Sequence, residues 1–191
     1  QMVSSIGIHG KAFFLDCLSL KYELLDIPTD WNFCLIDSEV QRNLRDSSYN
    51  ERYEQLKKAE GILNIQHLGT IKNDKLNEND FKDKVIYRRA KHVVSENKRV
   101  LDAKKFMQEN NIKMFGKLMN ESHQSYSQDF EASTKDVDLI TNQAIKCGAS
   151  GSRLTGGGFG GFTVSLIERK KYDNWYKKML NYYEENKFFK I

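Results

Sequence analysis

The sequence is poor in proline and cysteine, the residues that mark linkers or cross-link a chain. Its one proline, Pro28, leaves no Pro-rich linker in a length of 191 residues, which suits one large domain or two small ones. The three cysteines are odd in number and far apart, which fits neither a disulfide framework nor a zinc motif. We therefore expect a reducing, cytoplasmic setting and no metal site.

Long apolar runs are also missing. No segment approaches the roughly 20 apolar residues that a membrane helix needs, and the start QMVSSIGIHG lacks the regions of a signal peptide. The net charge is only +4 although 29% of the residues are charged, so nucleic acid is an unlikely partner. The hydrophobic fraction of 39% allows a core of ordinary size. Because residue 1 is Gln instead of Met, we expect a processed chain or a piece of a longer protein.

The apolar pattern predicts both strands and helices. We expect a strand pair within 11–26, strands at 32–36, 162–166 and 188–191, and helices at 48–59, 86–109, 115–126, 133–147 and 171–185. Ser133 and Asp136 have the spacing of a helix N-cap box, and the polar stretch 68–82 is interpreted as a surface loop. Strands and helices are grouped more than strictly alternated, which favours an α+β sandwich.

The most informative segment is GSRLTGGGFGGFTVSL, which runs from Gly151 to Leu166 and has five glycines between residues 156 and 161. Glycine allows a positive φ or a very close approach of a ligand to the backbone. Successive N–H groups in such a loop can form a concavity that binds anions. The segment therefore predicts a loop that holds phosphate or approaches a substrate, with a glycine turn between helix and strand that binds nothing as the alternative.

Several known glycine motifs fit this loop poorly. Gly156, Gly158 and Gly161 match G-x-G-x-x-G, but a strand-like segment follows where the dinucleotide fingerprint opens a helix. A Walker A loop needs Gly-Lys-Ser/Thr, and Phe162 follows the last glycine here. No protein-kinase signature set accompanies the loop. GFGGFTV is nearer to an RNA-recognition strand, although it has an extra glycine.

Five segments spread over most of the chain carry a family resemblance. They are KAFFLDCLSL, SSYNERYEQ (Ser47–Gln55), YRRAKHVVSENKRV (Tyr87–Val100), FGKLMNESHQSYSQDFEAS (Phe115–Ser133) and GSRLTGGGFGGFTVSLIE. Together they resemble the C-terminal part of the galactokinases, which are members of the GHMP small-molecule kinase superfamily. The glycine segment resembles the third GHMP motif, and the Tyr-Asn and Glu-Ser-His-x-Ser segments narrow the resemblance to galactokinase or a close sugar kinase.

The resemblance implies that residues 1–191 form a GHMP kinase C-terminal domain with a ferredoxin-like α/β sandwich. Residues 1–46 would hold strands that continue from an N-terminal half, and residues 84–191 the helices, the glycine loop and the final strand. It also implies ATP-dependent phosphorylation of galactose to galactose 1-phosphate, with Mg²⁺ accompanying ATP. The active site would lie in the cleft between this domain and an N-terminal GHMP domain.

The resemblance also implies which residues meet the ligands. Galactose would contact Tyr49, Thr155, Gly156, Gly157 and Gly158, and ATP would contact Gly158, Phe159, Gly160 and Gly161. A tyrosine suits a pyranose because it offers one flat apolar face and one hydroxyl. The resemblance implies no catalytic residue and no metal ligand within this chain.

Departures from the family pattern bear on activity. The family's first motif and its serine-rich phosphate loop are absent, and Gln1 matches the residue that follows the family's catalytic aspartate, so we expect the chain alone to be inactive. Phe162, where many relatives have Cys, is interpreted as a change in core packing, and Gln41 replaces a frequent Arg. The alternatives are a non-catalytic sugar or nucleotide sensor of the same fold and an RNA-binding module that uses Phe159 and Phe162.

We expect structural, surface or capping roles for several other charged and polar residues. The basic run from Arg88 to Arg99 is taken as a solvated helix face. His92 is taken as a structural or surface histidine, since none of the four histidines has the spacing of metal ligands. His123 lies in a family-like segment but receives no mechanistic role. Asp129 and Glu131 are interpreted as residues that cap a turn.

Overall fold

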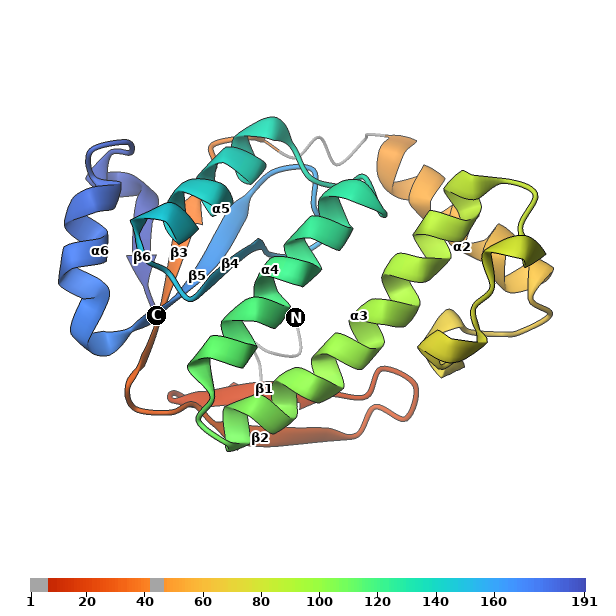
Figure 1. The fold of residues 1–191 in the computed structure, drawn as a ribbon, viewed down its shortest axis with the longest axis horizontal. Helices are drawn as coiled ribbons and strands as arrows, with labels where there is room; N and C mark the ends of the chain where they lie inside the picture. The colour runs from red at the N-terminus through yellow and green to blue at the C-terminus, as the bar shows by residue number, and fades with distance from the viewer. Residues whose placement is uncertain (1–6, 42–46) are drawn as a thin grey trace.

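The fold combines a four-stranded antiparallel sheet with helices, as the sequence predicts (Figure 1). The computed structural model describes residues 7–41 and 47–191. The strands of the sheet are β3 (Trp31–Asp37), β4 (Gly151–Leu154), β5 (Phe162–Glu168) and β6 (Phe188–Lys190), in the order β4-β5-β3-β6. Helices separate β3 from β4 and β5 from β6, which gives the β-α-β-β-α-β arrangement of ferredoxin-like folds. The predicted fold class is therefore confirmed.

The expected helices are all present, with corrected ends. They are α2 (Ser47–Ile62), α3 (Lys84–Gln108), α4 (Ile112–Gln128), α5 (Lys135–Cys147) and α6 (Tyr172–Met179). The last helix ends well before the predicted residue 185, and Tyr182, which lies beyond its end, is exposed. The N-cap of α5 is Thr134, whose hydroxyl accepts the N–H of Val137, and the hydroxyl of Ser133 donates instead to Asp138.

The stretch 68–82 is more ordered than a plain surface loop. It contains three short 3₁₀ turns, η1 (Leu68–Thr70), η2 (Asn73–Lys75) and η3 (Glu78–Asp80). Leu68 and Phe81 are buried and pack with Ile86 and Ala90 of α3. Burying these two side chains fixes the ends of the stretch against α3, so the prediction of a loop is correct but incomplete.

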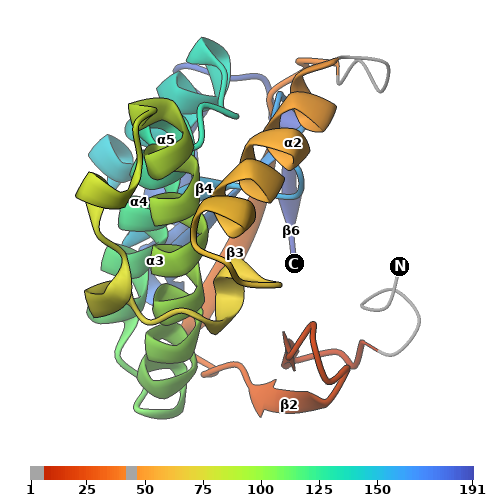
Figure 2. The same ribbon diagram turned by 90° about the vertical axis from the view of Figure 1, so that its right-hand side faces the viewer.

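The predicted strand pair is a separate two-stranded sheet. Strands β1 (Lys11–Leu15) and β2 (Tyr22–Asp26) pair in antiparallel register, and Figure 2 shows this hairpin apart from the four-stranded sheet. Lys104 of α3 pairs with Glu23 of β2 and lies over the ring of Phe14. A cavity of about 300 Å³ with mainly apolar walls lies between the hairpin, α3, α4 and the sheet.

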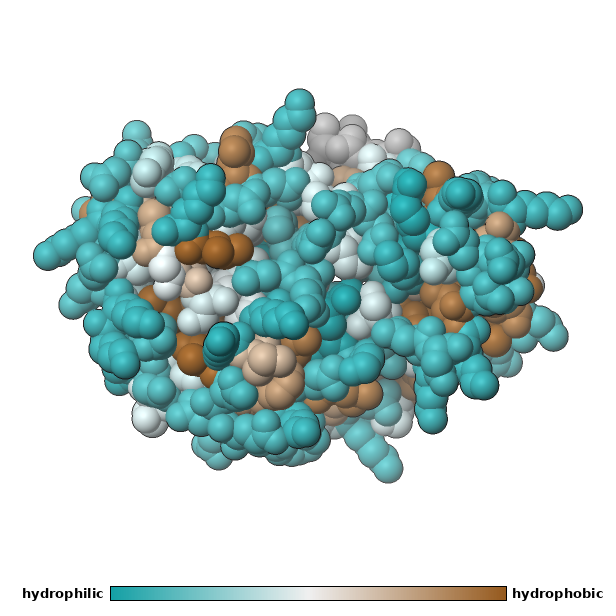
Figure 3. Space-filling model, viewed as in Figure 1, coloured by the Kyte–Doolittle hydropathy of each residue, from teal (hydrophilic) through white to brown (hydrophobic). Residues whose placement is uncertain are grey.

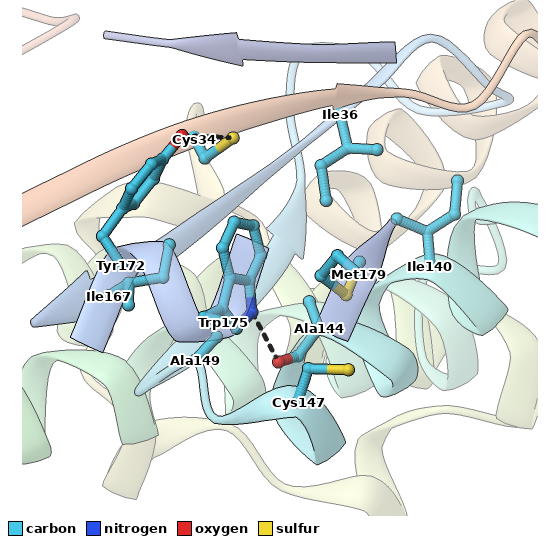
Figure 4. Packing of buried hydrophobic residues seen from close by; sticks show 10 residues of the cluster. All are labelled: Cys34, Ile36, Ile140, Ala144, Cys147, Ala149, Ile167, Tyr172, Trp175 and Met179. Atoms are coloured by element: carbon cyan, nitrogen blue, oxygen red, sulfur yellow. Dashed lines mark hydrogen bonds between the residues drawn. The ribbon is translucent and has the colours of Figure 1, made fainter. Parts of the chain in front are cut away.

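One face of the sheet is covered by α5 and α6, which bury a mixed aromatic and aliphatic core (Figure 4). Trp175 of α6 lies at its centre and donates its indole N–H to the carbonyl of Ala144 in α5, at 3.0 Å. Cys34 and Ile36 of β3 and Ile167 of β5 contribute from the sheet. This core holds β5 in place, and with it the end of the glycine segment.

Helix α4 lies unusually close to β4. A Cβ atom at Gly116 of α4 would lie 2.2 Å from the carbonyl oxygen of Ser150, and one at Gly151 would lie 2.4 Å from the carbonyl oxygen of Gly116. Real Cβ atoms never approach so closely, so both positions need glycine. The pair sets the position of β4, which leads directly into the glycine loop.

The surface is polar over most of the helical face in Figure 3, with smaller hydrophobic patches between the helices. In the part of the chain that the structure describes, no helix is both long and apolar enough to cross a membrane. The three cysteines are free, Cys17 exposed and the other two buried.

Candidate functional site

The glycine loop, residues 155–161, joins β4 to β5 as the turn of a hairpin. The alternative interpretation, a glycine turn between a helix and a strand, is wrong about the element that precedes the loop, because β4 intervenes. Thr155, at the start of the loop, donates its N–H to the carbonyl of Phe162 at 2.9 Å, which continues the ladder between the two strands. The prediction that a strand follows the loop is confirmed by β5.

Some of the glycines are required by the protein itself. A Cβ at Gly158 (φ +84°) would lie 2.3 Å from the carbonyl oxygen of Ala132, and one at Gly160 (φ +117°) would lie 2.4 Å from that of Val40. Both residues are buried. Close packing therefore explains these two glycines without any ligand.

Hydrogen bonds fix the loop from both sides. Phe159, which has a positive φ of 57°, donates its N–H to the carbonyl of Ala132 at 2.8 Å. Gly161 donates to the carbonyl of Val40 at 3.1 Å, and its own carbonyl accepts the N–H of Ser38 at 3.0 Å. The loop is therefore held between the α4–α5 turn and the segment that follows β3.

The exposed part of the loop is Gly156 and Gly157. Among the described residues, neither N–H donates a hydrogen bond to a backbone carbonyl. Tyr49, on the first turn of α2 and 65% exposed, has its ring edge 3.8 Å from the position of a Cβ at Gly157. The structure thus brings Tyr49 beside the two exposed glycines, although they are far apart in the sequence. Thr155 is half-buried at the edge of this surface.

The remaining predicted positions divide by exposure. Phe159 is half-buried in the loop. Phe162, interpreted as a core residue, is 36% exposed at the start of β5 and packs edge-on against Phe189 of β6, so it does not alter the buried core. Gln41 is exposed. Gln1, matched to the residue after the family's catalytic aspartate, lies outside the described residues.

A cluster of arginines beside the α4–α5 turn escapes the sequence analysis. Arg89, assigned to a solvated face, is only 1% exposed, which corrects that interpretation. Arg88 and Arg89 donate to the two carboxylate oxygens of Glu131 at 2.5 and 2.6 Å. The hydrogen bond and charge of Arg89, with help from Arg88 and Arg52, hold the pKa of Glu131 below its usual value against the effect of burial. The sequence predicts that Glu131 caps a turn. Glu131 instead links the α4–α5 turn to α3 and α2 through ion pairs with the arginines.

His92 and His123 are both buried and hydrogen-bonded within the protein. His92 stacks on Phe130 and hydrogen-bonds to Ser125 at 3.0 Å, and burial lowers its pKa to about 4. The structural role predicted for His92 is therefore confirmed.

His123 lies 3.1 Å from Asp138 and 2.8 Å from the hydroxyl of Thr141, and burial outweighs the effect of Asp138 and lowers its pKa too. Its other ring nitrogen accepts the N–H of Leu154 at 3.4 Å, just before the loop.

The described residues offer no ready metal site. Within 7–41 and 47–191, no three His, Cys, Asp or Glu side chains gather as a metal site would require. The loop instead offers backbone donors beside an exposed aromatic ring, an arrangement that suits an anionic or polyhydroxylated ligand.

Comparisons with known proteins show what the chain is similar to. Residues 103–184 match the family described as GHMP kinases C terminal. The chain is 33% identical over 97% of its length to a galactokinase of Lactobacillus helveticus and 35% identical over 97% to one of Clostridium perfringens, covering 50% of each. The chain therefore spans about half the length of these curated relatives.

Solved structures give the same result. The crystal structure of Lactococcus lactis galactokinase complexed with galactose matches 95% of this chain with a TM-score of 0.87 and 32% identity, and the chain covers 50% of it. The crystal structure of L. major mevalonate kinase in complex with R-mevalonate matches 94% of this chain with a TM-score of 0.57 and 18% identity, and the chain covers 47% of it, which shows a shared fold alone.

Proposed function

We propose that this chain, which carries the C-terminal domain of the GHMP kinases, is the C-terminal part of a galactokinase. In the proposed reaction, ATP phosphorylates the 1-hydroxyl of galactose and galactose 1-phosphate is the product. The observation that carries the proposal is the placement of Tyr49 beside the exposed Gly156 and Gly157, within a chain so similar to galactokinases.

The exposed residues have the chemistry that the reaction needs. The ring of Tyr49 can cover one face of a pyranose while its hydroxyl hydrogen-bonds to the sugar. The N–H groups of Gly156 and Gly157, with the hydroxyl of Thr155, can face sugar oxygens or a phosphate without steric bulk. Phosphoryl transfer depends mainly on positioning and charge stabilisation, so a rigid loop of donors is useful.

ATP is proposed to meet the loop at Gly158, Phe159, Gly160 and Gly161, with substrate at Tyr49, Thr155, Gly156, Gly157 and Gly158. The exposed donors next to these residues favour a phosphate group, although Gly158 and Gly160 lie buried against Ala132 and Val40. Mg²⁺ is proposed to arrive with the phosphates of ATP and to neutralise part of their charge.

Other parts of the machinery are assigned outside these residues. We propose that the catalytic base, the main ATP loop and most of the sugar contacts belong to the half of the relatives that this chain does not span, the N-terminal GHMP domain. Galactose metabolism in the cytoplasm is the proposed setting. The similarity to galactokinases does not favour the sensor or the RNA-binding alternative.

The test is ADP release by the natural gene product in the presence of galactose and MgATP. We expect galactose to stimulate release, and Tyr49→Ala to raise the KM for galactose about tenfold with little change in the KM for ATP. Tyr53→Ala is the matched control, because Tyr53 is exposed one turn further along α2. It should leave both KM values unchanged.

Other outcomes would redirect the proposal. A folded protein that binds galactose or ATP without releasing ADP would support the sensor. Binding of RNA that weakens steeply with salt and is lost in Phe159→Ala and Phe162→Ala would support the RNA-binding module.

A further inference from the structure

We infer that Glu131 and three arginines, Arg52, Arg88 and Arg89, form a positioning cluster that aligns the glycine loop with Tyr49. The cluster joins three elements. Arg52 lies on α2, Arg88 and Arg89 lie on α3, and Glu131 lies in the turn between α4 and α5. The arginines donate to groups of that turn at residues 129–131, so we infer that the cluster acts on the loop through the backbone of the turn.

The arginines hold the backbone of the turn as well as its carboxylate. Arg52 donates to the carbonyl of Phe130 at 2.7 Å and to that of Glu131 at 3.1 Å, and Arg89 donates to the carbonyl of Asp129 at 2.5 Å. Three successive carbonyls are therefore occupied by guanidinium donors. Glu131 itself has a φ of 52°, a conformation that a non-glycine residue keeps only where its surroundings enforce it.

The turn between α4 and α5 directly supports the glycine loop. Ala132 follows Glu131 directly and is fully buried. Its carbonyl accepts the N–H of Phe159, and its carbonyl oxygen and Cβ lie 2.3 and 3.1 Å from the position of a Cβ at Gly158. A small rotation of Glu131 would move this carbonyl and, because the contact is so close, would move Gly158 and Phe159 with it.

The same cluster positions the tyrosine. Arg52 lies three residues after Tyr49 on α2, so the two share one face of the helix. Anchoring Arg52 to the turn that carries the loop fixes the start of α2 relative to Gly157. The cluster thereby sets the distance between Tyr49 and the glycine loop. Apolar contacts could also hold these helices together, but the directional hydrogen bonds of buried arginines fix their relative position.

The test substitutes the carboxylate by an amide of similar shape, Glu131→Gln, in the natural gene product. Amide exchange at Phe159 is the direct readout, because its N–H bonds to the carbonyl of Ala132. We expect exchange in the loop to quicken about tenfold and kcat/KM for galactose to fall about tenfold. Glu131→Asp, which restores the charge on a shorter side chain, should recover part of both effects.

Two controls separate positioning from general stability. Asp102→Asn makes the same chemical change at an exposed ion pair with Lys98 on α3 and should alter neither readout. Met179→Ala destabilises the α5–α6 core and should quicken exchange throughout the protein without singling out the loop. If Glu131→Gln leaves exchange at Phe159 unchanged, or raises it only as Met179→Ala does, the positioning role is wrong.

The kinetic readout rests on the proposed function, whereas the exchange readout does not. Selective loosening of the loop in a protein that never phosphorylates galactose would overturn the proposed function and keep the positioning role. Full activity of Glu131→Gln with a loosened loop would show that the alignment is irrelevant to catalysis, and the inference would fail as stated.

Discussion

Within the described residues, the β1–β2 and β4–β5 hairpins hold their turns in opposite ways. The turn of β1–β2 is stabilised by its own residues, since Asp16 accepts the N–H of Leu18 and the hydroxyl of Ser19. The glycine loop of β4–β5 is held instead by carbonyls from elsewhere in the fold, at Ala132 and Val40. The first turn is exposed, and the second is compressed between neighbours.

The difference shows what glycine contributes in each place. Leu20 has a positive φ of 57° in the β1–β2 turn and is exposed, so a residue in the left-handed region need not be glycine there. At Gly158 and Gly160 a Cβ would meet a backbone oxygen. The richness in glycine therefore indicates close packing at Gly158 and Gly160, whereas Gly156 and Gly157 are exposed.

The largest effect is expected from an alanine placed in the compressed part of the loop. Gly158→Ala combines a left-handed φ, which costs about 1–2 kcal/mol, with a clash against Ala132 that costs about 1–3 kcal/mol. We expect a clear loss of stability and, for the activity proposed for the natural gene product, a fall of about 100-fold in galactose-dependent ADP release, since the loop must move. Urea unfolding and initial rates measure the two effects.

Gly157→Ala is the matched control for this change. A Cβ there would meet only the ring of Tyr49, at 3.8 Å, an ordinary contact. We expect its stability to change by less than about 0.5 kcal/mol. Equal destabilisation by the two substitutions would remove the distinction between a packed and an open half of the loop.

The second effect tests the same principle inside helices. Alanine normally stabilises a helix by up to about 1 kcal/mol relative to glycine. Gly61→Ala in α2 should therefore raise the free energy of unfolding by about 0.5 kcal/mol, because nothing lies within 4 Å of the new Cβ. Gly116→Ala in α4 should instead cost about 2–3 kcal/mol, because the new Cβ overlaps the carbonyl of Ser150. Denaturation midpoints of the two variants that move in the same direction would refute this account of how α4 reaches β4.

Local patterns predicted much of the fold. The long α3 shows clear helical spacing, and the alternation from Phe162 onward identifies β5. Strand β4 was missed because it has only four residues between a helix cap and the glycines. Residue type alone did not distinguish Ser133 from Thr134 as the cap of α5, because either hydroxyl can fill that role.

The candidate site was harder to predict in full. The resemblance pointed to Tyr49 and the loop, and the structure places them together. The loop is held by the backbone carbonyls of Val40 and Ala132. A backbone carbonyl leaves no signal in the residue types around it. The burial of Arg89 depends on Glu131, which is 42 residues away in the sequence. Such pairings arise only when the helices have packed.

The third effect is the dependence of stability on pH that arises from the buried His92. His92 is buried against Phe130, and its pKa is lowered to about 4 by burial. Between pH 6.5 and 5 the unfolded chain takes up a proton at this histidine while the folded chain does not, so stability falls as the pH falls. The contribution is about 2 kcal/mol over that interval. In His92→Gln, urea unfolding at a series of pH values should show a shallower decline, and parallel curves for variant and parent would contradict the assignment.

The smallest effect belongs to the open turn of β1–β2. Asparagine tolerates a positive φ better than leucine, and Leu20 is 63% exposed, so Leu20→Asn should stabilise the protein by about 0.5 kcal/mol without a change in activity. Leu18→Asn removes a similarly exposed leucine from the same turn at a position without positive φ. Thermal unfolding should therefore rise for Leu20→Asn alone. An equal rise for both variants would trace the gain to the loss of exposed apolar surface and would contradict the idea that the positive φ of Leu20 costs stability.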